Sequence, residues 1–169
     1  MGIFSCKSVN NVGGEIMKRF FAVLILTLVI AGGLTYFMPR DFTSYAAEIA
    51  PNGVVSVYCR QTELDGIDMG NGRIVECRTD ELQSVLEKCQ DVDGISVSFD
   101  GSEEDVSRIV ELLNLNVTHR YETCGIDIVC GQSYKINGGV VLDGKTVNVQ
   151  IALKDGVVTV GSPLILGSY

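Results

Sequence analysis

The sequence predicts an α+β domain in which two helices pack on a mainly antiparallel sheet, preceded by an N-terminal transmembrane or signal helix. Three observations support this fold class. The stretch Phe20–Met38 contains no charged residue. The segment Asn52–Ser162 contains no proline, which suits a sheet whose ladders need every backbone N–H. Within that segment the predicted order is ββαβαβ followed by further strands, an order typical of helices layered on an antiparallel sheet.

Residues 1–16 are polar, whereas Met17-Lys18-Arg19-Phe20 resembles the start of an export signal. The residues Val12–Ile16 can be encoded by a string that contains AGGAGG, a ribosome-binding sequence, a few nucleotides before the Met17 codon. We therefore expect translation to begin at Met17, and residues 1–16 to be upstream sequence that was assigned to the protein in error.

Residues 17–38 are expected to form a signal-anchor or transmembrane helix. The run Phe20–Met38 reads FFAVLILTLVIAGGLTYFM, and about 18 apolar residues suffice to span a bilayer. Lys18 and Arg19 precede it, so its N-terminal end should stay in the cytoplasm and the C-terminal domain should lie outside.

Two fates of this helix remain open. The run is longer than the ~7–15 residues of a typical signal-peptide core, which favours a retained anchor and a single-pass protein of the cell membrane. The alternative is cleavage and secretion, for which Ser44-Tyr45-Ala46 is the nearest small-residue site.

Residues 39–51 are expected to be a short tether with a proline at each end, and residues 52–169 to be the extracytoplasmic α+β domain. Alternating apolar residues and turn signals predict its strands. These strands are Val54–Cys59, Arg73–Arg78, Ile95–Phe99, Leu115–Glu122, Ile126–Cys130, Val140–Leu142, and a closing hairpin of Val147–Leu153 with Val158–Val160 around Asp155-Gly156.

Two helices are expected between the strands, each with a capping residue and one apolar face. The first begins at Asp80, with Gln83 as its capping partner, and carries the apolar stripe Leu82, Val85, Leu86 and Cys89. The second begins at Ser102, with Asp105 as its partner, and carries the stripe Val106, Ile109, Val110 and Leu113.

The closing hairpin carries a family resemblance. The segments Asn148–Leu153 and Thr159–Ile165, with the terminal Tyr169, resemble the C-terminal end of the YwmB-like proteins of Gram-positive, often spore-forming bacteria. The resemblance is specific over about 25 residues. It implies a fold related to the TATA-box-binding protein, an N-terminal export or anchor segment, and no established activity.

The charge excludes nucleic acid as a partner, whatever the fold resembles. Counting from Arg40, the exported part keeps 10 of the 13 Lys+Arg and 20 of the 21 Asp+Glu, because Lys7, Lys18, Arg19 and Glu15 lie upstream. Its net charge is therefore −10. A reader of the DNA minor groove needs a basic surface, and this domain would be repelled by phosphates.

The cysteines allow one candidate disulfide. Five of the six, Cys59, Cys77, Cys89, Cys124 and Cys130, follow the expected start. An odd number in an exported domain leaves at least one free thiol or an intermolecular bond. Cys59 and Cys77 lie on the first two strands, about equally far from a turn near Ile67–Asp68, so they either face each other as a disulfide or remain two unbridged sheet residues.

An exported enzyme using Cys124, Cys130 or His119 is the alternative function. No C-x-x-C spacing is present, and the sequence shows no partner carboxylate or nucleophile for His119. We therefore expect no catalytic residue, cofactor or metal site. The favoured function is a non-catalytic envelope domain that acts through protein–protein or envelope contacts. The polar strand residues Asn148 and Gln150 either form part of its interaction surface or are ordinary solvated strand residues, and the second reading is the simpler one.

Overall fold

The computed structural model describes residues 41–166, which belong to one compact unit, Pro39–Tyr169, distinct from the unit Met1–Met38. The expected start at Met17 and the expected membrane helix at Phe20–Met38 lie outside the described residues. Between residues 41 and 166, no helix is both long enough and apolar enough to cross a bilayer.

The described residues form an α+β domain built on a large antiparallel sheet, as the sequence predicts. Eight strands lie in the order β2-β3-β1-β4-β10-β9-β6-β5, and β7 and β8 form a separate two-stranded sheet. The strands are β1 (Val54–Thr62), β2 (Ile67–Asp68), β3 (Arg73–Arg78), β4 (Cys89–Asp100), β5 (Asn116–Thr123), β6 (Ile126–Gln132), β7 (Val140–Leu142), β8 (Lys145–Val147), β9 (Val149–Lys154) and β10 (Val157–Ser162). Three α-helices, rather than two, accompany them: α2 (Thr43–Ile49), α3 (Leu82–Leu86) and α4 (Glu103–Leu112).

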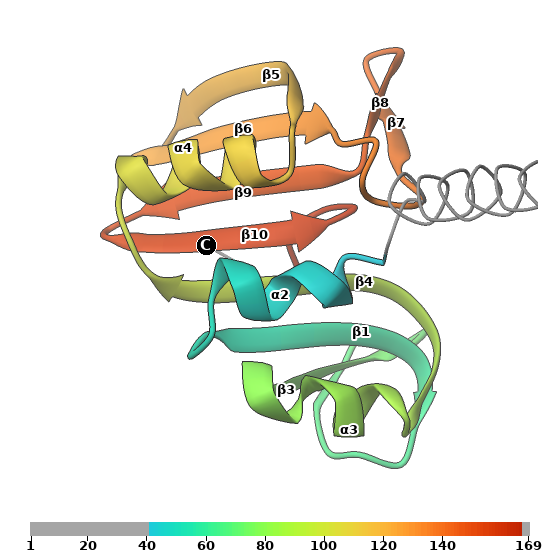
Figure 1. The fold of residues 1–169 in the computed structure, drawn as a ribbon. Helices are drawn as coiled ribbons and strands as arrows, with labels where there is room; N and C mark the ends of the chain where they lie inside the picture. The colour runs from blue at the N-terminus through green and yellow to red at the C-terminus, as the bar shows by residue number, and fades with distance from the viewer. Residues whose placement is uncertain (1–40, 167–169) are drawn as a thin grey trace, which may run out of the picture. The chain divides into compact units, whose positions relative to one another are not determined.

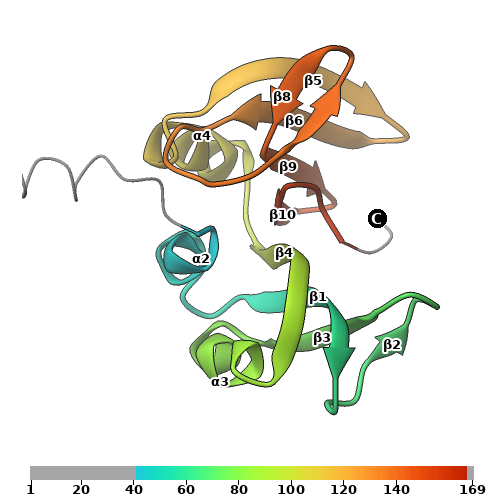
Figure 2. The ribbon, with the colours of Figure 1, turned by 90° about the vertical axis from the view of Figure 1, so that its right-hand side faces the viewer.

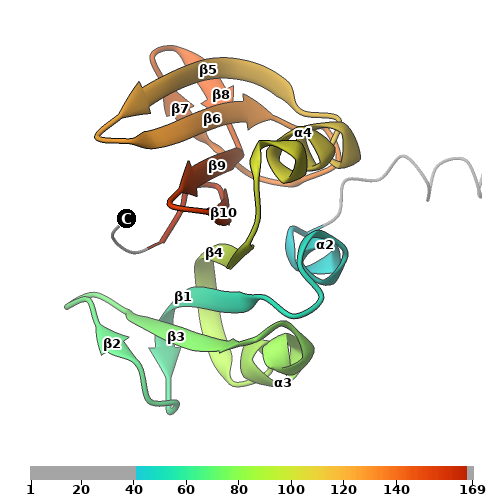
Figure 3. The ribbon, with the colours of Figure 1, turned by 90° about the vertical axis from the view of Figure 1, so that its left-hand side faces the viewer.

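All three helices lie on the same side of the eight-stranded sheet (Figure 1). The main core fills the space between them, and its members include Val55, Val97, Ile109, Ile151 and Val160, all fully or almost fully buried. Figures 2 and 3 show the sheet edge-on, with the helices on one side and the C-terminal segment on the other. We call the side without helices the open face.

The segment expected to be a tether instead contributes a helix to the core. Phe42, Ala46 and Ile49 of α2 are buried, and Ala46 is 0% exposed. Their spacing, with Ala50, is i, i+4, i+7 and i+8, which places them on one face of a helix. Burial of this apolar face against the sheet explains why the segment is helical rather than extended.

The first predicted helix is shorter than expected. A single 3₁₀ turn, Thr79–Glu81, precedes α3, and the carboxylate of Glu81 accepts a hydrogen bond from the backbone N–H of Arg78 at 3.1 Å. Cys89, expected on the helix, begins β4 and lies opposite Thr62 of β1. Pairing of β4 with β1 therefore replaces the last helical turn.

The second helix and the closing hairpin form as predicted. The Asp105 carboxylate accepts a hydrogen bond from the backbone N–H of Ser102 at 3.0 Å, and this bond caps α4. Strands β9 and β10 pair around Asp155-Gly156, both of which have positive φ, as a tight hairpin turn requires.

Candidate functional site

The open face of the sheet is the candidate functional site. Along each strand, the residues of this face alternate with residues whose side chains point into the core. Because Val55 and Val57 point toward the helices, Ser56 points to the open face, opposite Glu76 of β3 and Ser96 of β4. In Figure 2 the two ends of the sheet, β2 and β5, curve toward the side where the C-terminal segment lies.

A groove of about 530 Å³ lies on this face. Six strands and the C-terminal segment line it. The lining residues are Ser56, Ile67, Ile74, Glu76, Ser98, Ala152, Lys154, Asp155, Val157, Thr159, Ile165 and Leu166. Apolar and charged side chains are therefore mixed along one continuous surface.

Two of the residues that line the groove contact each other across neighbouring strands. The hydroxyls of Ser98 on β4 and Thr159 on β10 lie 2.9 Å apart and share a hydrogen bond. Ile67 and Val157 are exposed large hydrophobic residues on its rim. Glu76, Lys154 and Asp155 supply two carboxylates and one ammonium group, so the groove has an acidic excess.

Asn148 is not on an exposed face, so its expected role in an interaction surface is wrong. It is 2% exposed. Its Oδ1 accepts a hydrogen bond from the backbone N–H of Ser133 at 2.8 Å, and its Nδ2 donates to the carbonyls of Ser133 at 2.8 Å and Ile136 at 2.9 Å. The side chain holds the 133–136 loop in place.

Gln150 points to the open face, but its amide is used within the chain. Its Oε1 accepts a hydrogen bond from the backbone N–H of Ile165 at 3.0 Å. Leu164 and Ile165 pack against a small second cluster that includes Ile128, Cys130 and Ala152. Gln150 thus fixes the C-terminal segment across the open face, next to the groove.

Cys59 and Cys77 do not face each other, so of the two alternatives for this pair the structure shows the unbridged one. Cys59 lies opposite Arg73, and Cys77 lies opposite Val55. The offset of four residues along β1 corresponds to about 13 Å. The offset arises from the segment that links β1 to β3. Because β2, within that segment, pairs with β3, the turn before β3 is not midway between Cys59 and Cys77. Both thiols are free, and burial raises the pKa of each to about 11.

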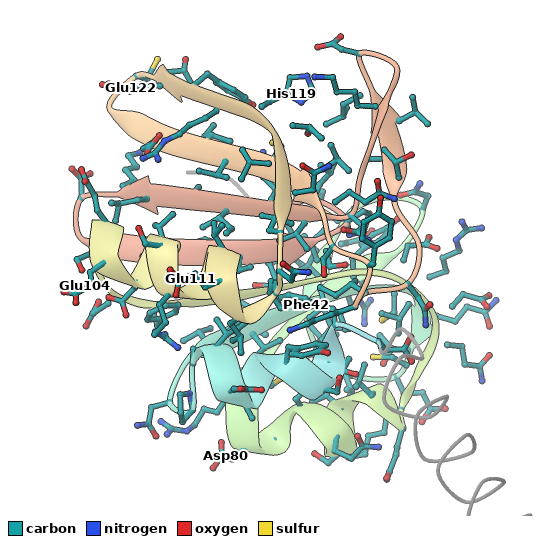
Figure 4. The ribbon with its side chains drawn as sticks, turned by 45° about the horizontal axis from the view of Figure 1, so that its top comes forward. Phe42, Asp80, Glu104, Glu111, His119 and Glu122 are labelled. Atoms are coloured by element: carbon teal, nitrogen blue, oxygen red, sulfur yellow. The ribbon has the colours of Figure 1, made fainter. Side chains whose placement is uncertain are left out.

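The structure brings together two of the three residues of the enzyme alternative, with a carboxylate beside them. His119 of β5 lies opposite Cys130 of β6, and its Nε2 lies 3.8 Å from an Asp143 carboxylate oxygen in the β7–β8 turn. His119 Nδ1 shares a hydrogen bond with the Thr118 hydroxyl at 3.0 Å. Figure 4 shows His119 beside the β7–β8 hairpin, with Glu122 at the other end of β5.

The thiol of Cys130 is not activated by this arrangement. It is buried, and burial raises its pKa, a change that the hydrogen bond with Tyr121 opposes only in part. A nucleophilic thiol needs the opposite change. Cys124 lies apart from this group, exposed in the β5–β6 turn with a φ of 52°.

Within residues 41–166, no group of three or more His, Cys, Asp or Glu side chains is placed to hold a metal ion. No family model, curated protein or solved structure matches the chain. The resemblance of the closing hairpin to the YwmB-like proteins stays a prediction from the sequence.

The sequence alone did not identify the groove. Its residues come from segments that are far apart in the chain, such as Glu76, Ser98 and Lys154. The only local signal was the polar member of each alternating strand, which equally describes an ordinary solvated face.

Proposed function

We propose that this protein is a membrane-tethered, extracytoplasmic and non-catalytic domain that binds a partner protein in the groove of its open face. The observation that carries the proposal is that groove: about 530 Å³, not covered by any of the three helices, and lined by both apolar and charged side chains. The resemblance to YwmB-like proteins supports a place in the cell envelope of a Gram-positive, spore-forming bacterium.

Retention of the anchor is supported by helix α2. Cleavage after Ser44-Tyr45-Ala46 would cut α2 in the middle and remove Phe42 from the core. Burying an aromatic side chain contributes about 2–3 kcal/mol, so the cut domain would lose a substantial part of its stability. A retained chain keeps α2 whole and attached to Phe20–Met38.

The chemistry of the groove favours a partner segment with apolar side chains flanked by basic ones. Ile67 and Val157 offer exposed apolar contact, while Glu76 and Asp155 outnumber Lys154. The overall charge of −10 from Arg40 onward acts in the same direction, because it attracts basic partners over longer range.

Site-specific photocrosslinking in the cells that make the protein tests this proposal. A benzophenone amino acid is placed at Ile67, on the groove, and separately at Ser107, which is exposed on α4. We expect one envelope protein to crosslink from position 67 and not from position 107, and Glu76→Lys to reduce its yield. Equal yields from both positions, or none from position 67, would contradict the groove as the binding surface.

An exported enzyme remains the second candidate because His119, Cys130 and Asp143 lie together. The raised pKa of Cys130 opposes it. Alkylation of the folded domain at neutral pH separates the two functions: rapid labelling of Cys130 would favour the enzyme, and slow labelling the binding domain.

A further inference from the structure

Strand β5 lies at one edge of the eight-stranded sheet, and no strand among the described residues pairs with its outer side. Figure 1 shows β5 at the top of the sheet, beside β6. Residues Arg120–Thr123, which end the strand, are all exposed. The unpaired backbone groups of an edge strand can pair with a strand of another chain, and most edge strands are protected against this. The edge of β5 is therefore a candidate binding surface.

The hairpin turn after β5 fixes which backbone groups face outward. Cys124 and Gly125 form a two-residue loop, and both have positive φ, 52° and 76°, as a type I′ turn requires. In such a hairpin Thr123 exchanges hydrogen bonds with its partner across the loop, and every second residue before it does the same. The N–H and C=O groups of Arg120 and Glu122 therefore point away from β6, toward the outer side.

The first half of this edge is protected. The ladder with β6 is irregular between Val117 and His119. The Lys145 ammonium group, from β8, donates to the carbonyl of Thr118 at 3.4 Å. Irregular pairing and lysine side chains are common protections of edge strands. The unprotected part is His119–Thr123, which we call the free edge.

The charges of the free edge are not balanced within the domain. Glu122 lies directly opposite Asp127 of β6, and like charges in that position repel each other. Arg120 donates to the Asp127 carboxylate at 2.7 Å. Glu122 makes no ion pair in the part of the chain that the structure describes. A cation that approaches the free edge from outside would therefore be attracted to Glu122.

We propose that the free edge pairs, in antiparallel orientation, with the free edge of a second copy of this chain, about a two-fold axis at Tyr121. Outward-facing residues must meet outward-facing residues, so the axis passes through a residue and not between two residues. An axis at Tyr121 places Arg120 opposite Glu122 of the second copy, and Glu122 opposite Arg120. An axis at Arg120 or at Glu122 would set two like charges against each other. An axis at either end of the free edge would lose most of the pairing.

This arrangement satisfies backbone groups and charges together. On each side of the axis, Arg120 of one copy and Glu122 of the other exchange N–H···O=C bonds. Each Arg120 then lies between the Asp127 carboxylate of its own chain and Glu122 of the second copy. One short strand pair buries less than the roughly 1,200 Å² of a standard interface, so we expect weak, concentration-dependent association.

Cysteine crosslinking of the purified full chain tests this register. All variants carry Cys124→Ser, because the Cys124 thiol is exposed. Tyr121→Cys places a thiol on the axis, where the two Cα atoms would lie about 4.5 Å apart, within the range of a disulfide. Thr123→Cys is the matched control: position 123 is exposed on the same face of β5, but its two copies would be offset by about 13 Å along the strands.

We expect oxidation with copper phenanthroline to give a covalent dimer severalfold faster from position 121 than from position 123, at a rate that rises with protein concentration. Equal rates at the two positions, or a faster rate at position 123, would overturn the inference.

Charge reversal on the Tyr121→Cys background tests the pairing of Arg120 with Glu122. Arg120→Glu and Glu122→Arg each set like charges against each other in a homodimer, so each should lower the yield of dimer severalfold. A mixture of the two variants restores opposite charges on both sides of the axis, and heterodimers should form at about the original rate. Variants that had merely misfolded could not recover on mixing. Yields that do not fall in the single variants, or do not recover in the mixture, would contradict the proposed dimer.

Discussion

The side-chain amide of Asn148 holds the backbone of Ser133 at two points, accepting from its N–H and donating to its carbonyl, each at 2.8 Å. This arrangement connects the start of β9 to the loop that carries Tyr134. It also explains how a polar residue can be buried without cost, since each polar atom of the amide has a partner.

We expect Asn148→Ala to lower the free energy of unfolding by about 2–4 kcal/mol, because it removes the acceptor of the buried Ser133 N–H and one donor from each of the Ser133 and Ile136 carbonyls. Urea denaturation measures the change. Asn148→Asp is the control, because it keeps the acceptor for Ser133 but sets a carboxylate against two carbonyls, so its destabilisation should shrink as the pH falls. If Asn148→Ala unfolded like the wild type, the side chain would not hold the loop.

Gln150→Ala should release the C-terminal segment without unfolding the domain. The variant loses one hydrogen bond to the Ile165 N–H, worth about 1 kcal/mol. Hydrogen exchange at Ile165 should accelerate, while exchange in β9 and β10 stays slow. Gln150→Glu retains an acceptor oxygen and should protect Ile165 better than alanine does. Unchanged exchange in Gln150→Ala would show that packing alone fixes the segment.

The cysteines should react with iodoacetamide in an order set by exposure. Cys124 is exposed and should be labelled first, whereas Cys59 and Cys130 are buried and should be labelled last at neutral pH. Mass spectrometry of a non-reduced digest should find no peptide that links Cys59 to Cys77. Such a peptide would require the β1–β3 register to shift by four residues.

Alkaline pH should destabilise the domain through Cys59 and Cys77. Each has a pKa of about 11 in the folded protein against 9.0 as the ordinary value, so the folded state retains protons that the unfolded state loses. Stability from this source is complete below about pH 9 and declines as the pH rises toward 11. Urea denaturation under reducing conditions should show a shallower decline in Cys59→Ala/Cys77→Ala. An equal decline of stability with pH in the wild type and the double variant would show that these thiols do not cause it.

Local signals in the sequence predicted the elements that local interactions stabilise. Ser102 with Asp105 marks the start of α4, and Asp155-Gly156 marks the closing turn. Both depend on residues close together in the chain, so their partners could be identified without the fold.

The features that the sequence did not predict depend on pairing between strands that are far apart in the chain. Asn148 breaks the expected alternation because the chain passes there from β8 to β9, and Val147, Asn148 and Val149 are all buried. The register of Cys59 and Cys77 depends on β2 pairing back onto β3. Helix α2 could have been recognised from the apolar spacing of Phe42–Ala50, but its proximity to the anchor segment favoured a tether.

The proposed function requires that α2 remain whole and attached to a membrane anchor. Trypsin cleaves after Arg40 and Arg60, so the peptide Asp41–Arg60 contains the alternative cleavage site intact. Mass spectrometry of the membrane and secreted fractions of native cells measures it directly. We expect Asp41–Arg60 in the membrane fraction. A peptide Ala47–Arg60 in the secreted fraction, with Asp41–Arg60 missing from both, would contradict it.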